Sequence, residues 1–107
     1  MARDPALEAR VVAWLDKRAD AGPRAMFGGL AWFLRGNLLC CASDRGLMAR
    51  LGKGREAWAL ARPGIEIMTG ARPMAGWVLA APGALDEEAG RRLIDAALAF
   101  VGALPPK

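Results

Sequence analysis

Histidine, tyrosine and glutamine are missing from the chain, and serine, threonine and asparagine occur once each, as Ser43, Thr69 and Asn37. A serine or cysteine nucleophile normally needs a positioned base, and histidine is the commonest one, so its absence excludes most catalytic templates. We expect the acidic run at residues 86–88 to lie at the start of a helix, facing water, rather than to form a catalytic carboxylate pair. We therefore predict a protein that is not an enzyme and needs no cofactor.

Cysteine is also scarce, with Cys40 and Cys41 as the only two. Neighbouring residues of a strand point to opposite faces of a sheet, so no disulfide between them is expected. We predict two buried thiols, as in a reducing compartment, while an activated thiol beside an arginine stays the alternative. Two adjacent cysteines without histidine lack the separated ligand pairs of a structural zinc site, so no metal site is predicted.

The chain has no apolar run near the roughly 20 residues that span a bilayer. Asp4 and Glu8 interrupt the region where a secretory signal needs an apolar segment. The length of 107 residues, with 54% hydrophobic and 24% charged residues, is typical of one globular domain with one core. We therefore expect a single cytoplasmic domain over residues 1–107, with no membrane contact.

Arginine, in contrast, is abundant: the chain has twelve arginines against three lysines and a formal net charge of +4. Because these cations are interleaved with acids along the whole chain, we interpret them as genome composition bias rather than as a nucleic-acid tract. Direct nucleic-acid binding stays open as an alternative, with phosphate contacts from four arginines: Arg24, Arg50, Arg55 and Arg72.

Two further features allow both a nucleic-acid and a structural interpretation. The stretch GKGR at residues 52–55 lacks the longer glycine, lysine and hydroxyl pattern of a nucleotide-binding loop, so we predict an exposed turn. The tryptophans fall on apolar stripes of different elements, which favours core anchors over base-stacking platforms: Trp14, Trp32, Trp58 and Trp77.

Hydrophobic periodicity predicts helices at both ends and strands between them. Residues 4–19 begin with an aspartate cap and Pro5, which favours a helix, and a last helix follows the acids at 86–88. A short helix is predicted over residues 53–62. Short apolar runs predict strands at 25–27, 30–34, 38–42, 47–51, 65–67 and 77–80, with Gly36 and Asn37 as a two-residue loop. The sequence thus predicts an α+β domain of two layers, an antiparallel sheet with the terminal helices on one face.

Two stretches, RAMFGG at residues 24–29 and GARPMAGWVL at 70–79, both combine arginine, methionine, glycine and an aromatic residue. We predict that their large apolar residues belong to the core: Met26, Phe27, Met74 and Trp77. Gly28 and Gly29 are predicted to form a sharp bend. Arg24 and Arg72 each precede an apolar run and are expected to meet at one end of the sheet. The candidate binding surface is therefore Arg24, Gly28, Gly29, Arg72 and Trp77.

From Arg24 to Lys107 the motifs RAMFGGLAWFLRGNLLCC, LMARLG, ARPG, TGARPMAGWVL and LAFVGALPPK, taken in order, resemble the TfoX N-terminal domain family, also called TfoX/Sxy. The resemblance implies an α+β domain related in shape to secretion-chaperone-like folds. It further implies a stand-alone, single-domain member of a group named for bacterial regulators of competence and DNA uptake. It implies no known reaction.

These observations favour a noncatalytic regulatory or adaptor module that acts by contact with a protein partner in a competence-type or related transcriptional circuit. Nucleic-acid binding is one alternative. A small anionic ligand between the sheet and a helix is another, with Arg24 and Arg72 supplying charge and Trp77 a wall. A homodimer also stays open, because antiparallel sheets expose edges.

Overall fold

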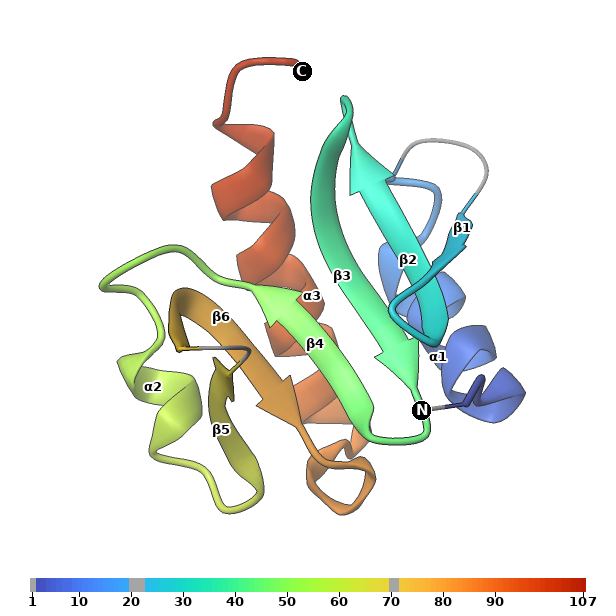
Figure 1. The fold of residues 1–107 in the computed structure, drawn as a ribbon, viewed down its shortest axis with the longest axis vertical. Coiled ribbons are helices and arrows are strands. Elements are labelled where there is room, and N and C mark those ends of the chain that lie inside the picture. The colour runs from blue at the N-terminus through green and yellow to red at the C-terminus, as the bar shows by residue number, and fades with distance from the viewer. Residues whose placement is uncertain (1, 20–22, 70–71) are drawn as a thin grey trace.

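The computed structural model describes residues 2–19, 23–69 and 72–107 (Figure 1). The elements follow in the order α1 (Pro5–Leu15), β1 (Arg24–Met26), β2 (Gly29–Leu34), β3 (Asn37–Ser43), β4 (Gly46–Arg50), α2 (Ala57–Leu60), β5 (Ile65–Thr69), β6 (Pro73–Ala80), a 3-10 turn η1 (Pro82–Ala84) and α3 (Glu87–Gly102). The strands form one antiparallel sheet in the order β1-β2-β3-β4-β6-β5. This is the α+β architecture predicted from the sequence.

The two long helices begin where their capping residues predict. Asp4 Oδ1 accepts a hydrogen bond from the Leu7 backbone N–H at 3.1 Å, and Asp86 Oδ1 accepts one from the Ala89 N–H at 2.7 Å. α1 ends at Leu15, not at residue 19 as predicted, because Asp16 and Lys17 take left-handed backbone angles.

The short helix predicted over residues 53–62 is reduced to α2, Ala57–Leu60. Gly52 and Gly54 have φ angles of 100° and 83°, which a right-handed helix does not allow. Both glycines therefore belong to the loop before α2.

The hairpin between β2 and β3 turns one residue earlier than predicted. Its loop is Arg35 and Gly36, with φ angles of 51° and 84°, while Asn37 pairs with Leu34 and belongs to β3. Positive φ at both central residues gives the turn a twist that matches the twist of the flanking strands. Asn37 is also held by a hydrogen bond that its Nδ2 donates to the Pro105 carbonyl at 3.0 Å.

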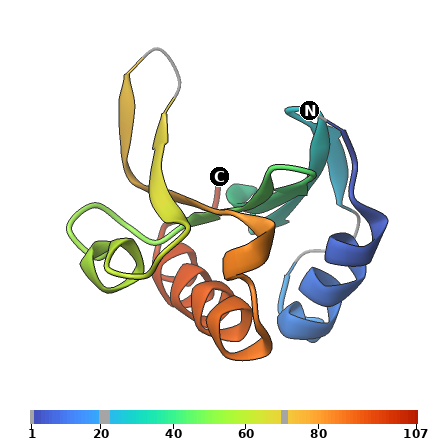
Figure 2. The same ribbon diagram turned by 90° about the horizontal axis from the view of Figure 1, so that it is seen from below.

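α1 and α3 cover one face of the sheet, and the main core lies between them and the strands (Figure 2). Its largest fully buried side chains come from both layers: Trp14, Leu39, Leu47, Leu51, Leu93 and Ile94. Trp14 and Trp32 are buried as predicted, whereas Trp58 and Trp77 are only half-buried. No helix within the described residues is long and apolar enough to cross a bilayer.

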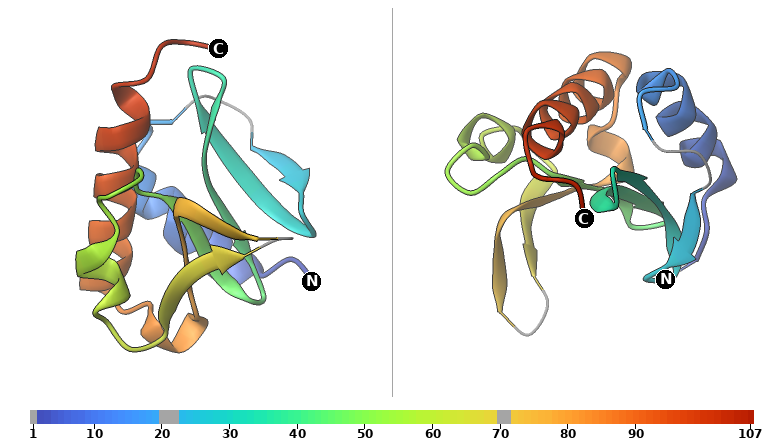
Figure 3. Two further views of the ribbon diagram at one scale, coloured as in Figure 1. Left: turned by 60° about the vertical axis from the view of Figure 1, so that its left-hand side comes forward. Right: turned by 90° about the horizontal axis from the view of Figure 1, so that it is seen from above.

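The other face of the sheet has no helix packed on it among the described elements. On this side the β1–β2 and β5–β6 hairpins project away from the helices, at the two ends of the sheet (Figures 2 and 3). The sheet is therefore concave on the face that α1 and α3 leave open.

Candidate functional site

The open face of the sheet has an apolar cluster of its own. Ala31, Cys41 and Met48 are buried there, although no helix covers them. Partly buried apolar side chains pack around them: Met26, Phe33, Leu38, Met68, Trp77 and Leu79. Because side chains alternate along a strand, these residues interleave with the ones that face α1 and α3. Each central strand thus has large apolar residues on both faces.

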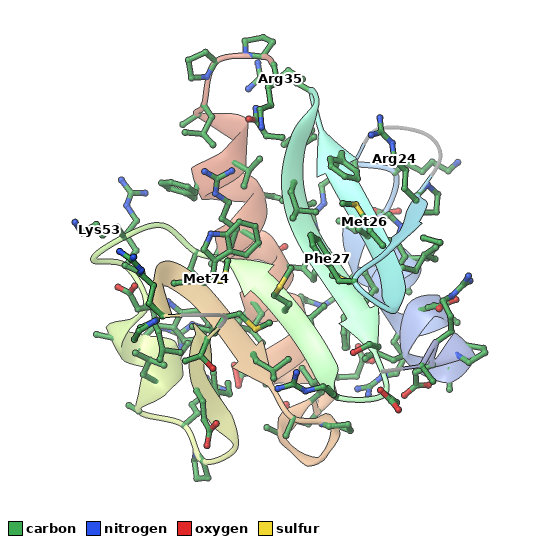
Figure 4. All side chains as sticks on the ribbon, in the orientation of Figure 1. Arg24, Met26, Phe27, Arg35, Lys53 and Met74 are labelled. Atoms are coloured by element: carbon green, nitrogen blue, oxygen red, sulfur yellow. The ribbon has the colours of Figure 1, made fainter. Side chains whose placement is uncertain are left out.

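Six residues of this cluster line a groove of about 200 Å³ that opens to solvent: Leu38, Cys41, Met48, Met68, Trp77 and Leu79. We call it the open-face groove. Its walls include Phe27 from the β1–β2 turn and Met74 from β6, and Figure 4 shows Phe27 near β2 and β3 and Met74 near β4 and β6. Among the described lining residues, only Ser43, Arg45 and Trp77 have a polar oxygen or nitrogen in the side chain. The groove is therefore a surface for apolar groups.

Phe27 and Met74 correct one prediction. Both were expected in the core, but Phe27 is 54% exposed and Met74 is 37% exposed. They project from the two hairpins instead of packing beneath the sheet. Large apolar side chains left in water beside an apolar groove are typical of a binding surface.

The backbone at Phe27 is unusual for an aromatic residue. Phe27 and Gly28 form the two-residue turn between Met26 and Gly29, with φ angles of 55° and 72°. Such turns favour asparagine, aspartate or glycine at the first position, because a β-carbon makes the left-handed conformation costly. Backbone strain of this kind is common where a side chain has a binding role.

Among the described residues, methionine is confined to the open face. Met26, Met48 and Met68 belong to its apolar cluster, and Met74 lines the groove. The helix-side core contains no methionine among its described residues. Methionine is flexible and polarisable, so it adapts to partners of different shape at little cost.

Arginines lie at the margins of this groove. The Arg24 guanidinium is 4.7 Å from the centre of the Phe33 ring, and that of Arg50 is 5.3 Å from the centre of the Trp77 ring. Arg45 itself lines the groove at the β3–β4 turn. Acids lie there too: Glu66 of β5 pairs with Leu79, which lines the groove, and Asp44 neighbours Arg45 in the β3–β4 turn. The surroundings of the groove therefore carry both signs, with arginines in excess.

The adjacent cysteines lie on opposite faces, as predicted. Cys40 is buried in the helix-side core, and burial raises the pKa of its thiol far above the ordinary value. Cys41 lines the open-face groove, and partial burial raises its pKa as well. Both thiols are therefore protonated at neutral pH, which does not favour a nucleophilic role.

The predicted surface residues lie in different places. Arg24 is on β1 and Arg72 directly precedes β6, and three strands separate β1 from β6 in the sheet. Trp77 lines the groove, and Gly28 occupies the left-handed turn. Gly29 is buried in β2, where a β-carbon would lie 2.3 Å from the Ala42 carbonyl oxygen. Trp77 therefore contributes to the groove, while Gly29 serves close strand packing.

The exposed turn predicted at residues 52–55 is confirmed for Lys53, Gly54 and Arg55, whereas Gly52 is buried. Arg50 and Arg55 both approach the Phe100 ring, at 5.6 and 5.8 Å from its centre. Lys53 lines a shallow pocket of about 140 Å³ beside the same ring. The turn thus brings cations together at one end of β4.

The sequence reasoning missed Cys41, Met48 and Met68 as lining residues. The signal was present in β3 and β4, where residues of both parities are apolar instead of alternating with polar ones. Such runs indicate a sheet with both faces covered, but α1 and α3 cover only one. An apolar face of the sheet with no helix predicted to cover it was therefore the sequence signal for the groove.

Comparison of the chain with known proteins gives no relative. No model of a protein family matches it, and neither does any curated protein or solved structure. The fold and the groove define it as an α+β domain with an open apolar face.

Proposed function

We propose that this chain is a noncatalytic adaptor or regulatory module that binds another protein in the open-face groove. The observation that carries the proposal is the groove itself, with Phe27 and Met74 exposed at its walls. A contiguous apolar surface of this kind costs solubility unless it has a binding role. The groove offers no nucleophile with a base, so contact rather than reaction is the activity that its chemistry supports.

The motifs that resemble the TfoX N-terminal domain family support a more specific setting. We place the module in a bacterial competence or related transcriptional circuit, where its task is to bring a partner protein into a complex. The methionine-lined groove fits an adaptor, because methionine allows one surface to accept related but different segments.

The test compares three forms of the full chain as bait in gentle affinity capture from the native cell. The first is the wild type and the second is the groove variant F27S/M74S. The third is V12S, a matched control, because Val12 is 55% exposed on α1 and lies on the other side of the sheet. A thermal melt of each form accompanies the capture and shows that the variants are folded, since Phe27 and Met74 are partly buried.

We expect the wild type and V12S to retain the same recurring protein, and F27S/M74S to lose it. Loss of two apolar anchors should weaken binding by about tenfold or more. The proposed function would be contradicted if F27S/M74S retained the partner as well as the wild type does. It would also be contradicted if no protein were captured by V12S and lost by F27S/M74S.

A further inference from the structure

We infer that the open-face groove binds a segment of a partner protein in which large apolar side chains are flanked by aspartate or glutamate. This inference rests on the proposed function and specifies the chemistry of the partner. It joins two observations, the apolar lining of the groove and the sign of the charges around it.

The lining determines the centre of the segment. Met48, Met68 and Leu79 present carbon and sulfur atoms to the groove, and Trp77 forms part of its wall. Met48, Met68 and Leu79 offer no hydrogen-bond donor, so a peptide side chain that leaves water against them has to be apolar. Leucine, methionine or phenylalanine meets this condition.

The arginines around the groove determine which residues should flank the apolar centre of the partner segment. Arg45 stands at one end of β4 and Arg50 at the other, and Arg24 lies on the β1 side. Arg50 stacks over Trp77, which lines the groove, and Arg24 stacks over Phe33, which belongs to the same open-face cluster. Because Arg24, Arg45 and Arg50 outnumber the acids Glu66 and Asp44 in these surroundings, acidic flanks gain net attraction and basic flanks meet net repulsion.

A second copy of the chain is the less favourable occupant. In a two-fold symmetric contact through this face, each arginine set would approach its own symmetry mate. The formal net charge of +4 opposes such self-association further. Nucleic acid also fits poorly, because phosphates need cations or N–H groups along their path and the floor of the groove offers carbon and sulfur.

The experiment selects peptides of about 16 residues from a random display library on the immobilised full chain. Enriched sequences are then synthesised with a fluorescent label, and their affinity is measured by fluorescence anisotropy. The proteins are the wild type, F27S/M74S, the rim variant R24E/R45E and the control R91E. Arg91 is exposed on α3, on the helix side of the sheet, so R91E applies a charge reversal away from the groove.

We expect the enriched peptides to combine clustered large apolar residues with an excess of acids. F27S/M74S should bind them about tenfold or more weakly. R24E/R45E should bind about threefold to tenfold more weakly, and the loss should shrink at high salt. R91E should stay within about twofold of the wild type.

The outcomes separate this inference from the proposed function. Peptides that lack an acidic excess, or that bind R24E/R45E as well as the wild type, overturn the acidic partner but keep a groove that binds protein. Binding that F27S/M74S leaves unchanged overturns both. Failure of the library to yield any enriched peptide would overturn the inference. So would a dimer in light scattering that F27S/M74S dissociates, or a labelled oligonucleotide that binds the wild type more tightly than any peptide.

Discussion

Phe27 shows how one residue can oppose the local conformational preference of a turn. Its left-handed backbone costs about 1–2 kcal/mol relative to a residue that accepts positive φ. About half of its surface is buried, which returns about 1 kcal/mol, since full burial of such a side chain is worth roughly twice that. The two effects nearly cancel, so folding stability alone does not explain a phenylalanine at this turn.

The variant F27N tests this balance. Asparagine tolerates positive φ, so the relieved strain should offset the lost burial, and the free energy of unfolding should stay within about 1 kcal/mol of the wild type. Peptide binding in the groove should nevertheless weaken by about tenfold or more, because the exposed aromatic anchor is gone. Urea unfolding and fluorescence anisotropy measure the two effects. A large loss of stability would instead give Phe27 a structural role.

At the scale of elements, the packing of α1 on α3 depends on a glycine. Trp14 of α1 is buried, and its Nε1 donates a hydrogen bond to Glu87 of α3 at 3.1 Å. A β-carbon on Gly90 would lie 2.1 Å from the Trp14 ring. Gly90 therefore makes room for the indole where a helix would otherwise favour alanine.

We predict that G90A destabilises the domain, against the ordinary trend. Alanine gains about 1 kcal/mol in helix propensity, but displacing a packed tryptophan costs more than this, so a net loss of about 1–2 kcal/mol is expected. G102A is the matched control in the same helix, because its nearest neighbour, Leu34 Cδ2, would lie at an ordinary 3.6 Å. Chemical unfolding of both variants measures the difference. Equal or higher stability of G90A would contradict this account of the α1–α3 contact.

Elements were predictable from the sequence where local chemistry decides them. The caps Asp4 and Asp86 mark the starts of α1 and α3, and the apolar runs mark the strands. Errors arose where backbone angles decide the outcome, as at Asp16, which ends α1, and at Gly52, which delays α2. The left-handed angle at Asp16 leaves little trace in an apolar pattern, and a glycine can stand either at a helix start or in the loop before it, so neither boundary could be placed.

At the scale of the whole molecule, three glutamates make the stability of the fold depend on pH in the acidic range. Arg3 lowers the pKa of Glu8 and Arg62 lowers the pKa of Glu88, in each case chiefly through side-chain hydrogen bonds. Backbone N–H groups, its own and those of Gly76 and Gly54, lower the pKa of Glu56. Since each folded-state pKa lies below the ordinary value of 4.5, these carboxylates stabilise the fold above that pH and lose their contribution as pH falls through their folded values.

We therefore predict a nearly constant thermal midpoint between pH 7 and about 5, followed by a fall below about pH 4.5. The chain has no histidine, which is the side chain that ordinarily titrates between these limits. Circular dichroism melts across this range provide the measurement. Because Glu8 and Glu88 are paired with arginines, about 0.5 M NaCl should flatten the acid limb. A midpoint that already falls between pH 7 and 5.5 would contradict the prediction.

The residues of the groove also differ in how far the sequence predicted them. Trp77 was identified from its motif, and it lines the groove. Phe27 and Met74 were assigned to the core because both are large and apolar, yet both are exposed. Hydrophobicity predicts that a residue can be buried, but not whether another element is available to bury it.

The sequence by itself determined the α+β class, the capped helices at both ends, the opposite faces of Cys40 and Cys41, and the absence of histidine chemistry. These properties follow from local preferences, the two-residue period of a strand and composition. The terminal helices were also expected on one face, and α1 and α3 do lie there, but the tertiary structure alone decided that Phe27, Met48, Met68 and Met74 border an open groove on the other face. The physical reason is that a local pattern records which residues are apolar, but not which of them another element or a turn leaves exposed.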